Sequence, residues 1–79
     1  MKIYLDVESV GLMGPTKLVQ FAIDDRPVQF IQLPRGWEAN PDTRRRLSLL
    51  MGLLDSSEAC LVAFNAAFDL FHIYRLAHR

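Results

Sequence analysis

Residues 2–8 read Lys2-Ile3-Tyr4-Leu5-Asp6-Val7-Glu8, an apolar run that leads into two acids. This run is typical of a β-strand, and we interpret residues 2–7 as a strand that is buried on both faces. Side chains two positions apart leave a strand on the same face, so Asp6 and Glu8 are expected side by side. Two neighbouring carboxylates repel each other, and a positive group between them relieves the repulsion. A hard divalent cation is the natural candidate, because Mg²⁺ and Mn²⁺ prefer carboxylate oxygens.

A second stretch near the other end of the chain, Asn65-Ala66-Ala67-Phe68-Asp69, offers a third acid for the same cluster. Each residue also has a plainer explanation. Asp6 and Glu8 could be a solvated pair on an edge strand, or Asp6 could cap a loop. Asp69 could be a first-turn acid that the helix dipole favours, and Asn65 could be the N-cap of that helix.

The intervening residues predict an α/β fold of one domain, residues 1–79, with elements in the order β-β-β-α-β-α. A loop is expected over residues 9–16 and a turn over residues 24–27. Asn40 and Pro41 are typical of a helix start. A strand, a crossover helix and a strand then suggest a parallel pair added to an antiparallel meander. The expected strands cover residues 2–7, 18–23, 28–33 and 59–64, and the expected helices cover residues 41–54 and residues 66 or 67 to the C-terminus.

Helical spacing identifies the apolar faces of the two expected helices. Leu47, Leu50, Met51 and Leu54 recur at i, i+3, i+4 and i+7 in the first helix. The second helix is expected to place four further residues on one face: Leu70, Ile73, Tyr74 and Ala77.

The composition is that of an ordinary small globular domain. Of the 79 residues 51% are hydrophobic, and nine basic residues balance nine acidic ones, so net charge gives no hint of a polyanionic partner. A single cysteine, Cys60, excludes an internal disulfide and favours a reducing, cytoplasmic setting. The first eight residues do not fit a signal peptide, and no apolar run reaches membrane-spanning length, so we expect no membrane partner.

Several other reactive or charged side chains have an ordinary structural interpretation. His72 is expected on the helix surface rather than as a general base, and His78 in a frayed tail. Cys60 is expected to be a small core residue. Arg44, Arg45 and Arg46 are first interpreted as the solvated face of a helix, with a phosphate-steering patch as the rival reading.

The two acidic stretches resemble sequence motifs of a known family. The stretch Tyr4-Leu5-Asp6-Val7-Glu8-Ser9-Val10-Gly11-Leu12 resembles the first motif of the DnaQ-like 3′–5′ exonucleases, and Asn65-Ala66-Ala67-Phe68-Asp69 resembles their second. The elements between them follow the family's order. The stretch Leu18-Val19-Gln20-Phe21-Ala22 further resembles the proofreading domain of family A DNA polymerases. The resemblance implies a ribonuclease-H-like mixed sheet.

The resemblance also implies a function, metal-dependent hydrolysis of DNA from the 3′ end. Asp6, Glu8 and Asp69 would be catalytic residues that bind two divalent ions, Mg²⁺ or Mn²⁺. Asn65, Phe68 and Leu12 would contact the single-stranded DNA 3′ end, Leu12 as an apolar wedge near the terminal base. A packed loop leucine and a core phenylalanine are the rival interpretations.

One family motif is not matched in these residues. The family's third motif carries a further Asp preceded by a Tyr or His, and no Asp follows Asp69. We therefore expect a truncated, N-terminal part of one exonuclease domain, whose partner would be the rest of a polymerase or exonuclease chain. These residues alone are expected to show no exonuclease activity. The alternative is a catalytically inactive nucleic-acid-binding or regulatory module of the same fold.

Overall fold

The computed structural model describes residues 1–77 and has one mixed four-stranded sheet and two α-helices. The predicted α/β class is confirmed, and the elements follow one another in the predicted order. The expected continuation of the last helix to residue 79, with His78 in its tail, lies outside the described residues. The elements are β1 (Lys2–Ser9), β2 (Thr16–Ile23), β3 (Gln29–Gln32), the 3₁₀ helix η1 (Trp37–Ala39), α1 (Pro41–Leu54), β4 (Cys60–Ala63) and α2 (Ala66–Ala77).

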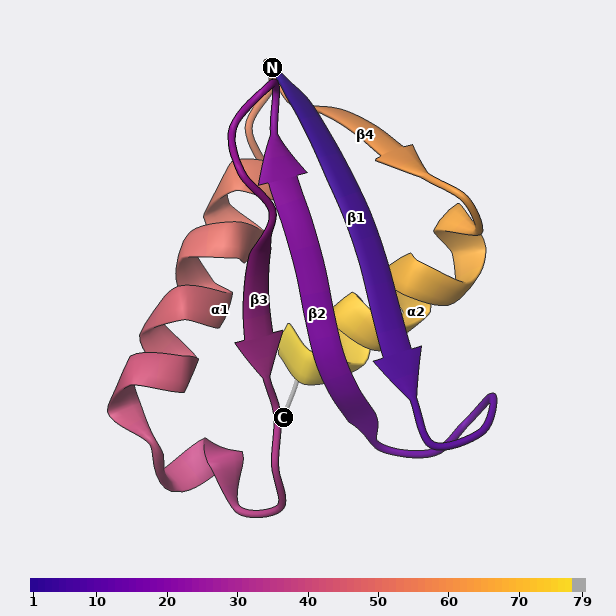
Figure 1. Cartoon of the computed structure of the whole chain (residues 1–79), viewed down its shortest axis with the longest axis vertical. Coiled ribbons are helices and arrows are strands. Elements are labelled where there is room, and N and C mark those ends of the chain that lie inside the picture. The colour runs from indigo at the N-terminus through magenta and orange to yellow at the C-terminus, as the bar shows by residue number, and fades with distance from the viewer. Residues whose placement is uncertain (78–79) are drawn as a thin grey trace.

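The sheet has the strand order β3-β2-β1-β4 (Figure 1). β2 runs antiparallel to both β1 and β3, whereas β4 runs parallel to β1. The chain passes from one edge of the sheet to the other through α1, because a parallel pair needs a long crossover. In the centre of the sheet Leu5 lies opposite Phe21 of β2 and Ala63 of β4.

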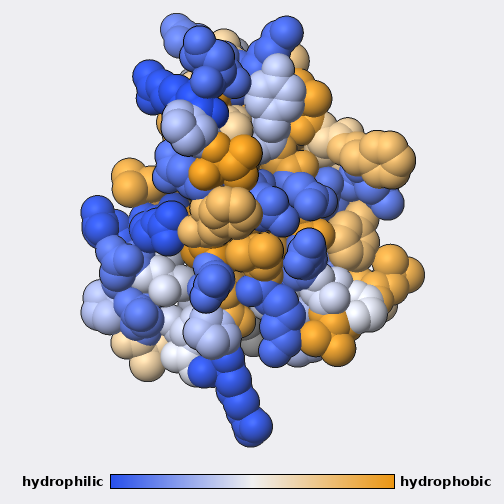
Figure 2. All heavy atoms as spheres, viewed as in Figure 1, coloured by the Kyte–Doolittle hydropathy of each residue, from blue (hydrophilic) through white to orange (hydrophobic). Residues whose placement is uncertain are grey.

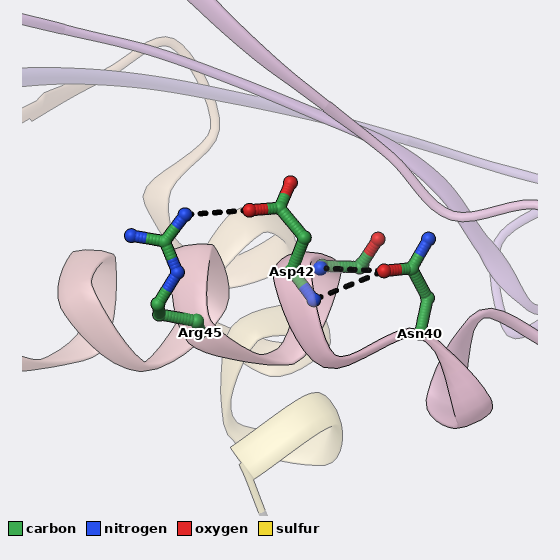
Figure 3. A network of polar contacts seen from close by, with 4 residues as sticks. Asn40, Asp42 and Arg45 are labelled. Atoms are coloured by element: carbon green, nitrogen blue, oxygen red, sulfur yellow. Dashed lines mark hydrogen bonds and ion pairs between the residues drawn. The ribbon is translucent and has the colours of Figure 1, made fainter.

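The start of α1 agrees with its sequence prediction (Figure 3). Oδ1 of Asn40 accepts hydrogen bonds from the backbone N–H groups of Asp42 at 3.0 Å and Thr43 at 3.3 Å. Pro41 occupies the first helical position, where a missing N–H costs nothing. Arg45 reaches back to Asp42 at 2.5 Å, but both side chains are well exposed, so this ion pair adds little stability.

The core lies on one face of the sheet only, where both helices cover it. β1 alternates exposed and buried positions along its length, and its buried side chains face the helices. Leu47 and Leu50 of α1 are buried, and Met51 and Leu54 pack against the core, as predicted. The buried residues of this hydrophobic core cluster are Ile3, Leu5, Val7, Val19, Phe21, Ile31, Leu33, Trp37, Leu47, Leu50, Ile73 and Leu76.

The expectation that the first strand is buried on both faces is wrong. Tyr4, Asp6 and Glu8 lie on the face that no helix covers. Figure 2 views this face and shows apolar and polar side chains mixed over the strands. The sequence from Lys2 to Glu8 alternates polar or amphipathic residues with aliphatic ones, which is the pattern of a sheet covered on one side.

Three further predictions are wrong in whole or in part. Cys60, expected in the core, is exposed, because it pairs with the exposed Lys2 on the uncovered face. β4 is shorter than predicted, so Phe64 lies outside it and is fully exposed. The buried face of α2 is the predicted one only in part: Ile73 is buried and Leu70 is half-buried, but Tyr74 is 60% exposed and Ala77 is exposed. The other buried residues of α2 are Asp69, His72 and Leu76.

Within residues 1–77, no helix is both long enough and apolar enough to cross a membrane.

Candidate active site

The first turn of α2 meets β1 at the point where β4 has ended. β4 pairs with β1 as far as Leu5, opposite Ala63, and β1 continues to Ser9. Beyond the last β4 pairing, Oδ1 of Asp69 accepts a hydrogen bond of 3.1 Å from the backbone N–H of Val7. The Asp69 carboxylate thus accepts the hydrogen bond that a backbone carbonyl of β4 would accept if that strand were longer. Because Val7 lies between Asp6 and Glu8, this bond brings the two acidic stretches of the sequence together.

Asp69 lies in an environment that disfavours its charge. The side chain is 2% exposed, and burial raises the pKa of its carboxyl above the usual value of 3.8. The Val7 hydrogen bond acts in the opposite direction, the negative charge of Asp6 raises the pKa further, and His72 lowers it. The balance is a raised pKa. A cation bound near Asp69 would lower the pKa of this carboxyl, because a positive charge favours the ionised form.

Asp6 and Glu8 share the uncovered face of β1, opposite Gln20 and Leu18 of β2. Asp6 also borders a shallow hollow of about 290 Å³ on that face. The side chains around this hollow are mostly apolar, and they include Tyr4, Ala22, Val28, Val62 and Phe64. An acid at the edge of an apolar, open surface can reach both solvent and a ligand that lies across the strands.

The three carboxylates do not form a closed ligand set. Among residues 1–77, no group of three or more His, Cys, Asp or Glu side chains lies close enough together to hold a metal ion. The chemistry of the donors still fits hard divalent ions, since Asp6, Glu8 and Asp69 offer only carboxylate oxygens. Asp6 and Asp69 are close enough for the charge of one to act on the pKa of the other.

The three residues expected to contact nucleic acid have different environments. Asn65 is exposed and caps α2, because its Oδ1 accepts from the backbone N–H of Phe68 at 3.4 Å. Phe68 is half-buried and packs its ring edge-on against His72, with centroids 4.6 Å apart. Leu12 lies in the β1–β2 loop (residues 10–15) and is 70% exposed. Of the three, Leu12 presents the largest apolar surface to a ligand.

Sequence reasoning missed the part of α2 that contacts the β1–β2 loop. His72, expected on the helix surface, is completely buried, and both of its ring nitrogens have partners. Arg75 was not singled out, yet its guanidinium donates hydrogen bonds to the carbonyls of Met13 and Gly14. The spacing of 69, 72, 73 and 76 is i, i+3, i+4 and i+7, so helical periodicity could have found this face if polar residues had been allowed on it.

Among the arginines of α1, Arg44 borders a hollow together with Leu76 and Ala77 at the end of α2. Arg44 and Arg45 are exposed and Arg46 is partly exposed, which agrees with the solvated-face interpretation.

Comparison with models of protein families, with curated protein sequences and with solved structures found no match to this chain. The arrangement of Asp6, Glu8 and Asp69 around Val7 is therefore the main basis for a functional argument.

Proposed function

We propose that this chain carries the first two acidic motifs of a DnaQ-like 3′–5′ exonuclease and that it binds the 3′ end of single-stranded DNA. The observation that carries the proposal is the hydrogen bond from Val7 N–H to Asp69 Oδ1. It joins the two stretches that resemble the family's first and second motifs, although Val7 and Asp69 are 62 positions apart in sequence. A chance pair of acidic stretches would have no reason to meet at one backbone amide.

The sheet gives a second line of support. A strand order of β3-β2-β1-β4, with an antiparallel meander followed by a strand parallel to β1, is compatible with a ribonuclease-H-like sheet. In this proposal the acids gather at the end of the central strand β1, next to the first turn of the helix that follows β4.

Asp6, Glu8 and Asp69 are the residues that would hold Mg²⁺ or Mn²⁺. Two such ions, when bound, would supply the charge that activates a water molecule and stabilises the leaving 3′ oxygen. The chain itself contributes orientation. Val7 N–H fixes one oxygen of Asp69, and the uncovered face leaves Asp6 and Glu8 open to a phosphate. Exposed Leu12, in the loop that follows β1, would lie against the terminal base.

A second candidate is a binding module of the same fold that performs no hydrolysis. The observation that favours it is the absence, among residues 1–77, of any three-residue group able to hold a metal ion. The two candidates differ in their need for divalent ions. A binding module would retain DNA without them, whereas the exonuclease site would depend on them.

The test is fluorescence anisotropy with a labelled single-stranded oligonucleotide that ends in a 3′-hydroxyl. We expect binding that increases with Mn²⁺ and that Asp6→Ala weakens by about tenfold or more. Asp25→Ala is the matched control, because Asp25 is an exposed acid in the turn after β2. Binding that is equal with and without Mn²⁺, and equal in Asp6→Ala, would favour the non-catalytic module. Absence of binding under all conditions would contradict both candidates.

A further inference from the structure

The β1–β2 loop exposes apolar side chains although its backbone is held in place. Val10 is 56% exposed, Leu12 70% and Met13 64%. Figure 1 shows this loop beyond the ends of β1 and β2, with α2 running behind both strands. A loop that carried these side chains only to fill space would turn them toward the core.

Two residues of α2 bind the loop through its carbonyl groups. Nε2 of His72 lies 3.2 Å from the carbonyl oxygen of Leu12 and donates to it. Arg75 donates from one nitrogen to the Met13 carbonyl at 2.7 Å and from the other to the Gly14 carbonyl. Three successive carbonyls, from Leu12 to Gly14, are thus bound by one helix, and the side chains of Leu12 and Met13 remain free to contact something else.

His72 and Arg75 are themselves held by their neighbours. His72 is fully buried, its Nδ1 lies 2.8 Å from the Thr16 hydroxyl, and the rings of Phe68 and Phe71 pack edge-on against it. The Arg75 guanidinium lies over the Phe71 ring, 5.3 Å from its centroid. Fixed donors of this kind restrict the loop before any ligand arrives, which reduces the entropy lost on binding.

The same helix also carries Asp69, whose carboxylate is bound to Val7 N–H. Asp69, His72 and Arg75 are spaced at three-residue intervals, so one rigid element fixes both the acid and the loop. The position of Leu12 relative to Asp69 is thereby restrained by α2, in addition to the loop's own hydrogen bonds from the Val10 N–H to the Pro15 carbonyl and from the Ser9 hydroxyl to the Gly11 carbonyl.

We propose that His72 and Arg75 are positioning residues that hold Leu12 against the terminal base of a DNA 3′ end bound at Asp6 and Asp69. This inference rests on the proposed function, because the acids define where the 3′ end lies. The two residues would act through the loop and would not touch the DNA. Their loss would therefore loosen the loop and lower the affinity together.

The experiment uses two measurements on the 79-residue chain. ¹⁵N relaxation gives backbone order parameters for residues 11–14 without DNA. An oligonucleotide with 2-aminopurine as its 3′-terminal base reports unstacking of that base, since stacking quenches its fluorescence. We expect ordered loop amides in the wild type, with order parameters of about 0.85. We also expect a rise in fluorescence when the wild type binds in Mn²⁺, and a smaller rise for Leu12→Ala.

Arg75→Ala is the decisive variant, and Arg44→Ala is its control, because Arg44 is an exposed arginine of α1. Both changes remove one positive charge. For Arg75→Ala we expect loop order parameters below about 0.6, affinity reduced about tenfold and a loss of the fluorescence rise. Arg75→Lys keeps the charge but not the planar pair of donors, so its loop order and its affinity should lie between those of Arg75→Ala and Arg44→Ala. His72→Gln keeps a donor for the Leu12 carbonyl and should reduce loop order and affinity less than His72→Ala does.

The outcomes separate the positioning role from the proposed function. If the wild type binds and unstacks the terminal base while Arg75→Ala does the same with an equally ordered loop, the positioning role is overturned and the exonuclease proposal stands. If Arg75→Ala weakens binding without loosening the loop, Arg75 contacts DNA directly and the positioning role is again overturned. If the wild type binds no 3′ end, both proposals fall together.

Discussion

The hydroxyl of Thr16 lies 2.8 Å from Nδ1 of His72, and both side chains are buried. The other ring nitrogen faces the Leu12 carbonyl, which can only accept a hydrogen bond. Nε2 therefore carries the proton in a neutral ring, and Nδ1 accepts from the Thr16 hydroxyl. This hydrogen bond joins the first residue of β2 to the middle of α2.

Replacing Thr16 by valine should destabilise the fold. Thr16→Val keeps the shape of the side chain but leaves Nδ1 of His72 buried without a donor, which costs about 1–3 kcal/mol. Urea denaturation followed by circular dichroism measures the change. Thr16→Ser retains the hydroxyl, and its free energy of unfolding is expected to fall less than that of Thr16→Val. Equal stability of Thr16→Val and the wild type would show that the bond contributes nothing.

Replacing Asp69 by asparagine should stabilise the protein at neutral pH. The raised pKa of Asp69 means that, between 3.8 and the folded value, the folded chain binds more protons than the unfolded chain. Stability from this group therefore falls as the pH rises through that interval and stays low above it. Asp69→Asn keeps an oxygen for the Val7 N–H and removes the charge.

Urea midpoints of the wild type and Asp69→Asn, measured from pH 4 to pH 8, test this expectation. The gain in stability of Asp69→Asn over the wild type should be largest near pH 8, and it should shrink toward pH 4 as Asp69 of the wild type takes up a proton. Asp25→Asn, on an exposed turn, should show no such pH-dependent gain. A destabilised Asp69→Asn at pH 7 would mean that the ionised carboxylate is favoured by the fold.

The chain should bind Mn²⁺ weakly at the end of β1. Only three carboxylates are offered and they do not form a closed set, so we expect a dissociation constant no tighter than about 0.1 mM. Calorimetry measures the affinity. Fe²⁺ with ascorbate and peroxide locates the site, because hydroxyl radicals cut the backbone beside the bound ion. Cuts are expected near Asp6 and Asp69.

Asp6→Ala should abolish those cuts, whereas Asp25→Ala should leave them in place. An unchanged cutting pattern in Asp6→Ala would argue against a metal site built on Asp6.

The uncovered face of the sheet should cause self-association. Phe30 is 52% exposed and Phe64 is fully exposed, and Tyr4 and Val62 add apolar surface on the same face. Sedimentation velocity over a range of concentrations should show association that the double change Phe30→Ser and Phe64→Ser reduces. Leu49→Ser is the control, since Leu49 is 60% exposed on α1. A monomer at every concentration would contradict this prediction.

The sequence was sufficient for those elements that local chemistry determines. Asn40 and Pro41 predict the start of α1 because a side-chain acceptor and a residue without N–H both suit a helix N-terminus. The spacing of Leu47 and Leu50 predicts the buried face of that helix. The strand order could also be expected, because a meander followed by a crossover helix leaves few arrangements.

Features that depend on contacts between distant elements were not predictable in the same way. The alternation over residues 2–8 is the pattern of a sheet that is covered on one side, but it was interpreted as a strand buried on both faces, so the exposure of Tyr4 and Cys60 was missed. His72 was misassigned because a histidine on a helix is commonly exposed, and its burial depends on Thr16 and Leu12 as distant hydrogen-bond partners. The sequence suggested Asp69 only as a third acid beside Asp6 and Glu8, and its hydrogen bond from the backbone N–H of Val7 was not anticipated.

The difference in length between β1 and β4 has a consequence for how this chain tolerates change. β1 has eight residues and β4 has four, and Asp69 reaches Val7 because β4 stops at Ala63. An apolar replacement within β4 leaves the strand length unchanged, so the Val7 N–H stays accessible to the Asp69 carboxylate. An insertion that extends β4 by two residues would pair this N–H with backbone and displace the carboxylate. The length of β4, more than the identity of its side chains, therefore decides whether the Asp69 carboxylate can lie next to Asp6.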